Sequence, residues 1–586
     1  MTRTNGKKHT QSGRATESFN PIASRRRASA RIMAQLLECF GGELPSKASC
    51  DSVYDQAFCA SGENFRATYL AAEAFSKFDP EDASTLTIRQ QAAATSFLEG
   101  EAQCRATNRR LVWDPWGSQS VARVLRISQR LIADVLGDFD LEEFVLLCSH
   151  GSGATADLAR AKSSPQNKWT VGTHTVTPSA LPYALAVSQW FPNHGEELPG
   201  RNNGSFLVTY HDVLDSVNKD MARNRVIGKG PTMNVFFQKG IGKLHRRRLN
   251  RKGLLRKDAQ EHHQRLARQG SLHGHLATVD LKNASSTIAY ALVIHAYSQA
   301  DPAWLTHMCA LRANRWRWRS GHPDAGLDEG RYEMFSAMGN GFTFEMETLL
   351  FWSLTKAVCL VLGLPTSLEV LSVYGDDIIC PVEAVPLLKE VFDHVGLTFN
   401  AKKSHWVGPF RESCGGHFYN GSEVTPFYIK KPVSSVVDLI NVHNRVSLWL
   451  ARGRVRDAGL EKVLTICRSA VPKKYWGPPG LAGTLWSPWH LSGAQWSRGR
   501  QSYSVCSLAY ANSRQLAECA SGALRYWFWS KRFGGASAVT DELVTEYVPE
   551  VDKGRVVETR LCFDRQRFDW AAHEAYLGPV YLTAEL

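Results

Sequence analysis

The chain contains no Cys-x-x-Cys pair and no apolar run long enough to cross a membrane. Its thirteen cysteines are scattered from Cys39 to Cys562, and an odd, dispersed set argues against a disulfide framework. The most apolar stretch, residues 349–365, is interrupted by Lys356 and is too short for a membrane span. The N-terminus lacks the apolar core of a signal peptide. We therefore expect a protein with reduced thiols that does not bind membranes.

A zinc site is not expected either. Cys414 and His417 have the spacing of half a site, but the sequence offers no second half. A structural Cys and His in a turn is the better interpretation.

The length and charge of the chain narrow the class of protein further. A chain of 586 residues with 44% hydrophobic and 10% aromatic residues is globular and too long for one compact core. The net charge is +13 and the isoelectric point is about 9.1. This excess of cations favours a polyanionic partner, with nucleic acid as the leading candidate.

Acidic residues are nearly missing between positions 219 and 257, where Asp220 is the only acid beside thirteen Lys or Arg residues. The segment before Pro231 is predicted to be extended or looped, and the segment after it helical. We interpret the whole stretch as a phosphate-binding face, although a charge run that merely solubilises the chain is the alternative. The cations of the extended part are Lys219, Arg223, Arg225 and Lys229.

The most informative stretch runs from Val370 to Cys380. Two short apolar segments rich in β-branched residues flank Gly375, Asp376 and Asp377, which is the pattern of a buried β-hairpin with two carboxylates at its tip. Adjacent like charges at such a tip repel each other unless a cation lies between them. The alternative is an ordinary Asp-rich surface turn.

Two further segments carry polar residues next to apolar ones. Residues 276–280 predict a strand that ends in Asp280, followed by a helix for which Ser285 or Ser286 would be the cap. Residues 338–345 predict a glycine-containing loop that enters a long apolar helix. The glycine-rich residues 150–155 lack the lysine of a phosphate-binding loop and are interpreted as a structural turn.

Aromatic residues gather at two places. Residues 315–319 alternate arginine with tryptophan, which suits stacking on bases or a partly buried structural ladder. The C-terminal tryptophans are more typical of a core or an interface than of a platform that stacks on nucleotides. These C-terminal residues are Trp476, Trp486, Trp489, Trp496, Trp527 and Trp529.

The order of these segments resembles the successive motifs of viral RNA-dependent RNA polymerases. The motifs are the strand ending in Asp280, the loop at 338–345, the Tyr-Gly-Asp-Asp at 374–377, Lys402 with Lys403, and residues 410–415. More narrowly, the chain is similar to the replicase β subunit of the single-stranded positive-sense RNA bacteriophages. The resemblance covers about residues 219–432.

This resemblance implies an α+β fold in the shape of a right hand, with an antiparallel palm sheet packed by helices and a mainly helical thumb. We expect a flexible basic arm at 1–30, fingers at 31–270, a palm at 271–432 with an inserted fingers segment at about 300–335, and a thumb and C-terminal region at 433–586.

Phosphodiester synthesis uses two divalent ions, and hard carboxylate oxygens suit Mg²⁺, with Mn²⁺ able to substitute. By resemblance, Asp280 and Asp376 are the principal ligands, Asp377 assists them, and the main-chain carbonyl of Leu281 contributes. Either Lys402 or Lys403 would protonate the leaving pyrophosphate, and the sequence does not choose between them.

The resemblance also assigns residues to the nucleotide. Arg223 and Arg225, with Lys219, would hold the triphosphate because guanidinium groups match phosphate oxygens and keep their charge. The residues expected near the ribose and the template base are Ser285, Gly339, Asn340 and Thr343.

By resemblance, the partners are an RNA template and product, ribonucleoside triphosphates, the host elongation factors Tu and Ts, and a ribosomal RNA-binding protein, in the cytoplasm of an infected bacterium. Two other functions remain open. A reverse transcriptase shares the paired aspartates, but the glycines at 339, 341 and 375 favour an RNA polymerase. A non-catalytic RNA-binding protein would explain the charge but not the three aspartates.

Overall fold

The structure is a computed structural model that describes residues 21–44, 46–59, 62–80, 83–159, 163–170, 174–189, 206–322, 328–453, 456–498, 502–510 and 556–563. The chain divides into two compact units. Of the described residues, the larger unit comprises those within 46–431, and the smaller comprises those within 21–44, 432–510 and 556–563. No helix in the described part of the chain is long and apolar enough to span a membrane.

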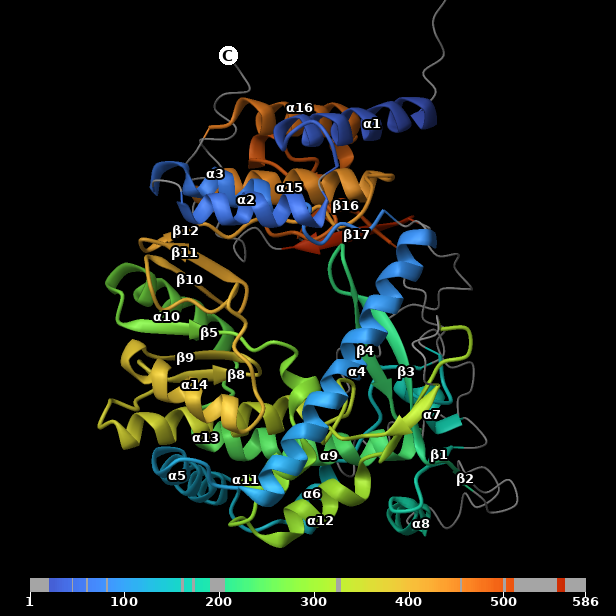
Figure 1. Ribbon diagram of the computed structural model, residues 1–586. Coiled ribbons are helices and arrows are strands. Elements are labelled where there is room, and N and C mark those ends of the chain that lie inside the picture. The colour runs from blue at the N-terminus through green and yellow to red at the C-terminus, as the bar shows by residue number, and fades with distance from the viewer. Residues whose placement is uncertain are drawn as a thin grey trace, which may run out of the picture. The chain divides into compact units, whose positions relative to one another are not determined.

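Helices form most of the larger unit, and one extended hydrophobic core joins α5, α9 and α13 (Figure 1). Its helices are α2 (Lys47–Cys59), α3 (Gly62–Glu73), α4 (Ala83–Trp113), α5 (Gln119–Leu136), α6 (Leu141–Leu147), α7 (Pro165–Thr170), α8 (Leu181–Gln189), α9 (Thr232–Arg251), α10 (Ala259–His273), α11 (Tyr290–Ala296), α12 (Pro302–Leu311), α13 (Thr343–Val361) and α14 (Val385–His394). Short 3-10 turns lie at Ala284–Thr287 (η3) and Val382–Ala384 (η4).

An antiparallel sheet of three strands, in the order β5-β9-β8, carries the predicted hairpin. Its strands are β5 (Leu276–Val279), β8 (Ser372–Tyr374) and β9 (Asp377–Pro381). Side chains alternate between two faces along a strand. Leu276 and Ile379 meet Leu266 of α10 on one face, whereas Val279 and Ile378 join the core that contains α13 on the other. Burial on both faces explains why these strands are almost wholly apolar.

A second sheet has the order β4-β3-β6-β7 and holds two of the predicted segments. Its strands are β3 (His211–Asn218), β4 (Asn224–Lys229), β6 (Arg315–Trp318) and β7 (Glu329–Arg331). Trp316 is 2% exposed and meets Phe97 edge to face at 5.2 Å between ring centroids. The alternating Arg and Trp residues therefore form the partly buried structural ladder rather than a free stacking surface.

Three strands form a meander beside α10 (Figure 1), and two more form a parallel pair. The meander consists of β10 (Phe410–Ser413), β11 (Gly416–Tyr419) and β12 (Ser422–Glu423), and the pair of β1 (Thr175–Val176) and β2 (Leu207–Val208). Cys414 and Gly415 have positive φ angles of 48° and 71° and form the tight turn between β10 and β11. This confirms the structural interpretation of Cys414.

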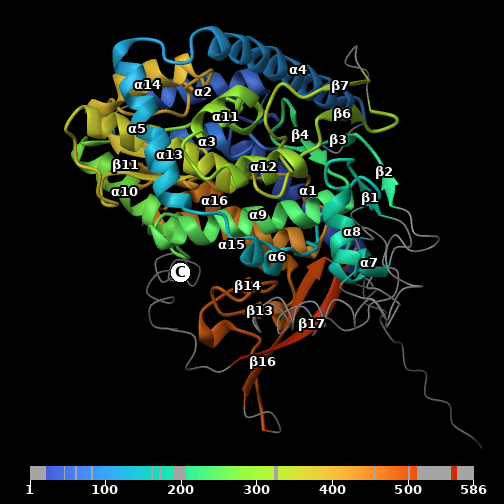
Figure 2. The same ribbon diagram turned by 90° about the horizontal axis from the view of Figure 1, so that it is seen from below.

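The smaller unit combines helices from both ends of the chain with short sheets. Helix α1 (Pro21–Cys39) packs on α16 (Ala458–Ala470), which also contacts α15 (Val436–Gly453). The strands are β13 (Trp476–Gly477), β14 (Leu485–Trp486), β15 (Gln495–Ser497), β16 (Ser502–Tyr510) and β17 (Val556–Phe563). Figure 2 shows β16 and β17 as a long antiparallel ribbon, which the sequence patterns did not reveal.

The structure corrects two local predictions. The expected flexible arm at 1–30 overlaps α1 from Pro21 onward, because Ile32 and Leu36 lie four residues apart and bury one face of that helix; residues 1–20 lie outside the described residues. Neither Ser285 nor Ser286 caps a helix. Ala289 precedes α11 without a side-chain cap, and Ser285 is buried within η3 instead.

The α+β class is confirmed, with helices packed on both faces of an antiparallel sheet where the palm was expected. Trp476 is buried and Trp496 is 50% exposed. Trp527 and Trp529 lie outside the described residues.

Candidate active site

Three carboxylates lie at one end of the β5-β9-β8 sheet. Tyr374 pairs with Asp377 across a turn formed by Gly375 and Asp376, and Gly375 has the positive φ of 61° that the first turn position of a type II′ hairpin requires. Val279 pairs with Ile378, so Asp280 follows β5 at the same end where Asp377 begins β9. Asp376 is exposed, and the other two carboxylates are partly buried.

The carboxylates influence one another electrostatically. Burial raises the pKa of Asp280 to about 6, a shift that Lys403 opposes and Asp376 reinforces. Burial also raises the pKa of Asp377 to about 7, and Asp376, Glu412 and Asp280 add to the rise. Burial is thus the larger cause of both shifts, and repulsion between neighbouring carboxylates adds to it.

The chemistry of these donors fits a hard divalent cation. Carboxylate oxygens are the preferred ligands of Mg²⁺, and an ion among them would offset the repulsion that adds to the rise of their pKa values. The oxygens do not form a ready-made cage, because no group of three or more His, Cys, Asp or Glu residues within the described ranges is arranged to hold a metal ion. Binding would thus require the side chains to move.

Residues absent from the sequence prediction hold Asp280 in place. Asn400 donates from Nδ2 to Asp280 Oδ2 at 2.7 Å, and Ser404 Oγ accepts from the Asp280 amide at 3.1 Å. Leu281 is buried and bridges to Phe399 in the same segment. The position of Asn400, two residues before Lys402, was a hint that it belongs to the same motif. The sequence alone does not show that its side chain reaches Asp280.

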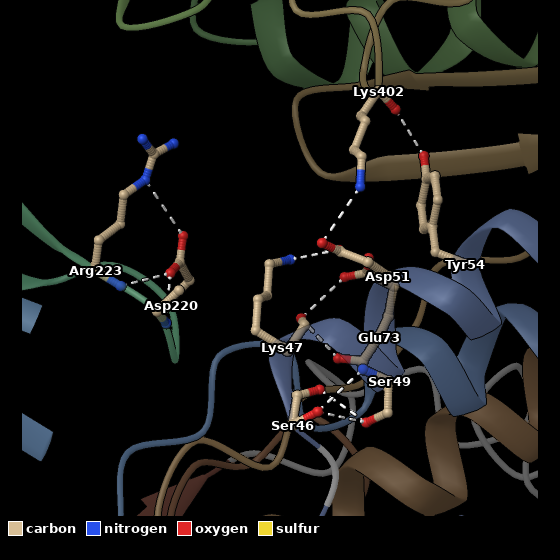
Figure 3. A network of polar contacts seen from close by, with 11 residues as sticks. Ser46, Lys47, Ser49, Asp51, Tyr54, Glu73, Asp220, Arg223 and Lys402 are labelled. Atoms are coloured by element: carbon tan, nitrogen blue, oxygen red, sulfur yellow. Dashed lines mark hydrogen bonds and ion pairs between the residues drawn. The ribbon is translucent and has the colours of Figure 1, made fainter. Parts of the chain in front are cut away.

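The structure separates the two candidate lysines. Desolvation opposes the charged form of Lys403, but the attraction of Glu412, Asp280 and Asp377 is larger in sum and raises its pKa. Lys403 therefore lies within the electrostatic influence of the candidate carboxylates. Lys402 instead pairs with Asp51 of α2, with its Nζ 3.3 Å from Asp51 Oδ2 (Figure 3).

Glu347 is a second residue that the sequence did not reveal. It lies on α13 and is 5% exposed. Its Oε2 accepts a hydrogen bond from Ser285 Oγ at 2.7 Å, and its Oε1 lies beside Gly375. Burial raises the pKa of Glu347 to about 8, which Ser285 opposes and Asp376 increases. Glu347 therefore links the segment after Asp280 to the turn that carries Asp376.

The predicted triphosphate-binding cations occupy the β3-β4 hairpin and its tip. Burial lowers the pKa of Lys219 to about 8, and repulsion from Arg223, Arg225 and Lys403 contributes to the shift. Arg223 lies over its neighbour Asp220 (Figure 3), with Nε 3.9 Å from Oδ2. The structure thus brings Lys219 within electrostatic reach of Lys403 as well as of Arg223 and Arg225, although Lys403 lies far from all three in the sequence.

In the second half of the basic stretch, which follows Pro231, several cations form ion pairs with acids from other elements. Arg246 pairs with Glu345 of α13 at 2.8 Å, and Arg247 pairs with Glu143 of α6 at 2.8 Å. Lys252 pairs with Asp134 of α5 at 2.7 Å. Acids that are distant in sequence therefore offset part of the charge on this end of α9.

The loop at 338–343 packs against β4 and α9. The Gly228 amide donates to the Met338 carbonyl at 2.8 Å, and a Cβ on Gly339, where φ is +111°, would collide with the Gly228 carbonyl oxygen. Asn340 Oδ1 accepts from the Phe342 amide at 3.1 Å. Thr343 is buried, and its hydroxyl contacts Ser336 Oγ at 2.7 Å. Glycine is therefore needed at position 339 because the Gly228 carbonyl leaves no room for a Cβ, a contact that the sequence did not show.

A cavity of about 670 Å³ lies apart from these residues. It is lined by residues 134–141 and by Arg248, Arg251 and Lys252. None of the predicted site residues borders it, and its acids and cations are mixed, so the carboxylate end of the sheet remains the candidate active site.

Comparisons with known proteins agree on one family. Residues 27–504 match the family described as RNA replicase, beta-chain. The chain is 37% identical over 454 residues to the RNA-directed RNA polymerase subunit beta of Escherichia virus Qbeta, covering 76% of this chain and 72% of that protein. It is 36% identical over 377 residues to the RNA-directed RNA polymerase beta chain of Escherichia phage MS2, covering 64% of each.

Among solved structures, one titled "RdRp complex" matches 60% of this chain and 33% of that chain, with 12% identity and a TM-score of 0.38. This likeness is too weak to support an argument.

Proposed function

Because the chain belongs to the RNA replicase β-chain family and is an RNA-directed RNA polymerase, we propose that it replicates a viral RNA genome by two-metal-ion transfer of nucleotides from ribonucleoside triphosphates. The observation that carries this proposal is the meeting of Asp280, Asp376 and Asp377 at one end of a sheet, with Lys403 and the cations of the β3-β4 hairpin nearby.

Asp280 and Asp376 would hold the two Mg²⁺ ions, or Mn²⁺ in their place, with Asp377 and the Leu281 carbonyl in support. When bound, the ions make the 3′-hydroxyl a better nucleophile and neutralise the charge of the departing pyrophosphate. Asn400 and Ser404 keep Asp280 oriented. Glu347 links the Ser285 side chain to the turn that carries Asp376.

Lys403 is the proton donor to the leaving pyrophosphate in this proposal. The nearby carboxylates keep it protonated, and an ammonium group at that position can release a proton as negative charge develops on the leaving oxygen. Lys402 is engaged with Asp51 of α2.

The β3-β4 hairpin would hold the incoming triphosphate through Arg223, Arg225 and Lys219. The mutual repulsion of these cations is relieved when phosphate oxygens lie between them. Ser285 would face the ribose, and the loop that contains Gly339, Asn340 and Thr343 would border the template base.

Replacing Asp376 by Asn tests the metal assignment. The change keeps the size of the side chain but removes a charged ligand, so nucleotide incorporation with Mg²⁺ should fall by several orders of magnitude, on the order of 10³-fold or more. RNA affinity should remain nearly the same. Asp393→Asn is the matched control, because this exposed carboxylate pairs only with Lys389 on its own helix among the described contacts. Substantial polymerisation by Asp376→Asn would refute the assignment.

We also propose that initiation needs no primer and that the subunit works in the cytoplasm of an infected bacterium with the host elongation factors Tu and Ts and a ribosomal RNA-binding protein. Family membership supports these expectations. Copy synthesis from an unprimed RNA template, and mass spectrometry of proteins that co-purify from infected cells, are the direct tests. Exchanging RNA for DNA and ribonucleotides for deoxyribonucleotides separates this function from reverse transcription.

A further inference from the structure

The turn at residues 400–404 carries both lysines and is fixed to the strand that leads to Asp280. Thr278 and His405 exchange backbone hydrogen bonds of 2.9 and 2.7 Å, and the Asn400 amide donates to the Asp280 carbonyl at 2.8 Å. The Lys403 amide closes the turn by donating to the Asn400 carbonyl at 3.0 Å. The inner side of the turn is therefore tied to the active site.

Helix α2 covers the outer side of this turn, although it lies about 350 residues earlier in the sequence. Tyr54 donates its hydroxyl hydrogen to the Lys402 carbonyl at 2.8 Å. The Phe58 ring stacks on His405 with centroids 5.6 Å apart and planes inclined by 3°. Asp51 binds the Lys402 ammonium group and is itself held by Lys47 at 2.8 Å. Asp51, Tyr54 and Phe58 follow the spacing of one helical face.

These contacts hold the turn at Lys402 and at His405, which lie on either side of Lys403 in the sequence, and none of them uses the Lys403 side chain. Figure 3 shows Lys402 reaching from the turn to Asp51, with Tyr54 at the Lys402 backbone. Neighbouring lysines in a turn could exchange places if the backbone rotated. A hydrogen bond to the carbonyl between them opposes that rotation directly.

We infer that Tyr54 and Asp51 of α2 are positioning residues that hold the 400–404 turn so that Lys403, and not Lys402, faces the reacting phosphates. This inference rests on the proposed role of Lys403. Asp51 holds Lys402 away from the site by an ion pair, and Tyr54 fixes the backbone from which Lys403 projects. Burial raises the pKa of the Tyr54 hydroxyl, so it stays a hydrogen-bond donor at neutral pH.

The test is a double-mutant cycle measured by single-nucleotide incorporation on a defined primed RNA. Tyr54→Phe removes the donor but keeps the ring that packs on Phe58 at 4.8 Å. Loss of one such bond should lower kcat by roughly five- to tenfold with little change in the nucleotide KM. In the Lys403→Ala background, the same change should have less than about a twofold effect, because the group that it positions is gone.

Two further variants complete the design. Asp51→Asn weakens the hold on Lys402 and should reduce kcat in the same Lys403-dependent way. Tyr183→Phe is the matched control, since it removes a hydroxyl that contacts His307 Nδ1 at 2.6 Å elsewhere in the same unit, and it should leave kcat unchanged. Thermal unfolding and RNA affinity, measured for each protein, separate a misfolded variant from a mispositioned lysine.

The outcomes discriminate between the hypotheses. An equal loss from Tyr54→Phe with and without Lys403 would overturn the positioning role and leave the metal mechanism standing. Wild-type turnover by Lys403→Ala would overturn both the proton-donor role and the positioning inference. Activity in Asp376→Asn would refute the proposed mechanism itself.

Discussion

At the scale of single residues, Glu347 shows how a buried acid can organise a site without belonging to a recognisable motif. A carboxyl group that is 5% exposed is costly unless it is hydrogen-bonded. Ser285 donates to one oxygen, and the other lies against the Gly375 turn. The sequence hinted at this role only by placing Glu345 and Glu347 within an otherwise apolar helix. It did not identify their partners, because Arg246, which pairs with Glu345, and Ser285, which binds Glu347, come from distant segments.

This geometry predicts different consequences for two substitutions at Glu347. Glu347→Ala removes the acceptor for Ser285 and should reduce nucleotide incorporation by about tenfold or more, with weaker selection of ribonucleotides over deoxyribonucleotides. Glu347→Gln keeps an oxygen acceptor and the size of the side chain, and should retain most activity. Steady-state kinetics with both sugars would check the prediction. Equal defects in the two variants would show that charge, rather than the hydrogen bond, is what matters.

At the scale of secondary-structure elements, the hairpin and the helix of the basic stretch have different surroundings. In the β3-β4 hairpin, the pKa of Lys219 is lowered partly by neighbouring cations, so this element gains by binding phosphate. At the end of α9, the acids Glu143, Glu345 and Asp134 offset several cations. The hairpin should therefore contribute more to nucleotide binding than the helix does.

Single alanine substitutions separate the two elements. Arg225→Ala should raise the nucleotide KM by roughly ten- to hundredfold, the effect of losing a charge-assisted contact. Arg247→Ala should mainly weaken RNA binding. The number of salt ions released on binding, read from the salt dependence of the affinity, should fall by about one or less, because Glu143 already neutralises part of the charge of Arg247. Nucleotide titrations and RNA binding at several salt concentrations measure both effects. Equal losses of RNA affinity, without a change in KM, would contradict this division.

Elements also show where prediction from the sequence worked. The hairpin at Asp376, the strand before Asp280 and the helix after Phe342 were predictable, because each has a local pattern of apolar residues and a glycine at its turn. Three contacts could not be predicted from the sequence. They are the hydrogen bond from Asn400 to Asp280, the close approach of Gly339 to Gly228, and the hydrogen bond from Tyr54 to Lys402. Each joins segments whose proximity only the folded chain reveals.

At the scale of the whole molecule, segments from both ends of the chain build the smaller unit. Ile32 and Leu36 of α1 are fully buried, and α1 packs on α16. A Cβ on Gly459, at the start of α16, would lie 2.7 Å from Cys39 Sγ, so the two helices approach closely there. The unit therefore depends on a helix that precedes the entire larger unit in the sequence.

Weakening this helix should destabilise the smaller unit selectively. Leu36→Ala removes buried methyl groups and leaves a cavity, so it should lower the unfolding free energy of that unit by about 2–5 kcal/mol. Glu38→Ala, at an exposed position of the same helix, is the control and should change it by less than about 0.5 kcal/mol. Limited proteolysis with mass spectrometry would locate the weakened region. Faster cleavage within residues 432–510, with residues 46–431 cut at the wild-type rate, is the expected result, because the larger unit has its own core. Equal acceleration in both units would show instead that they unfold as one cooperative body.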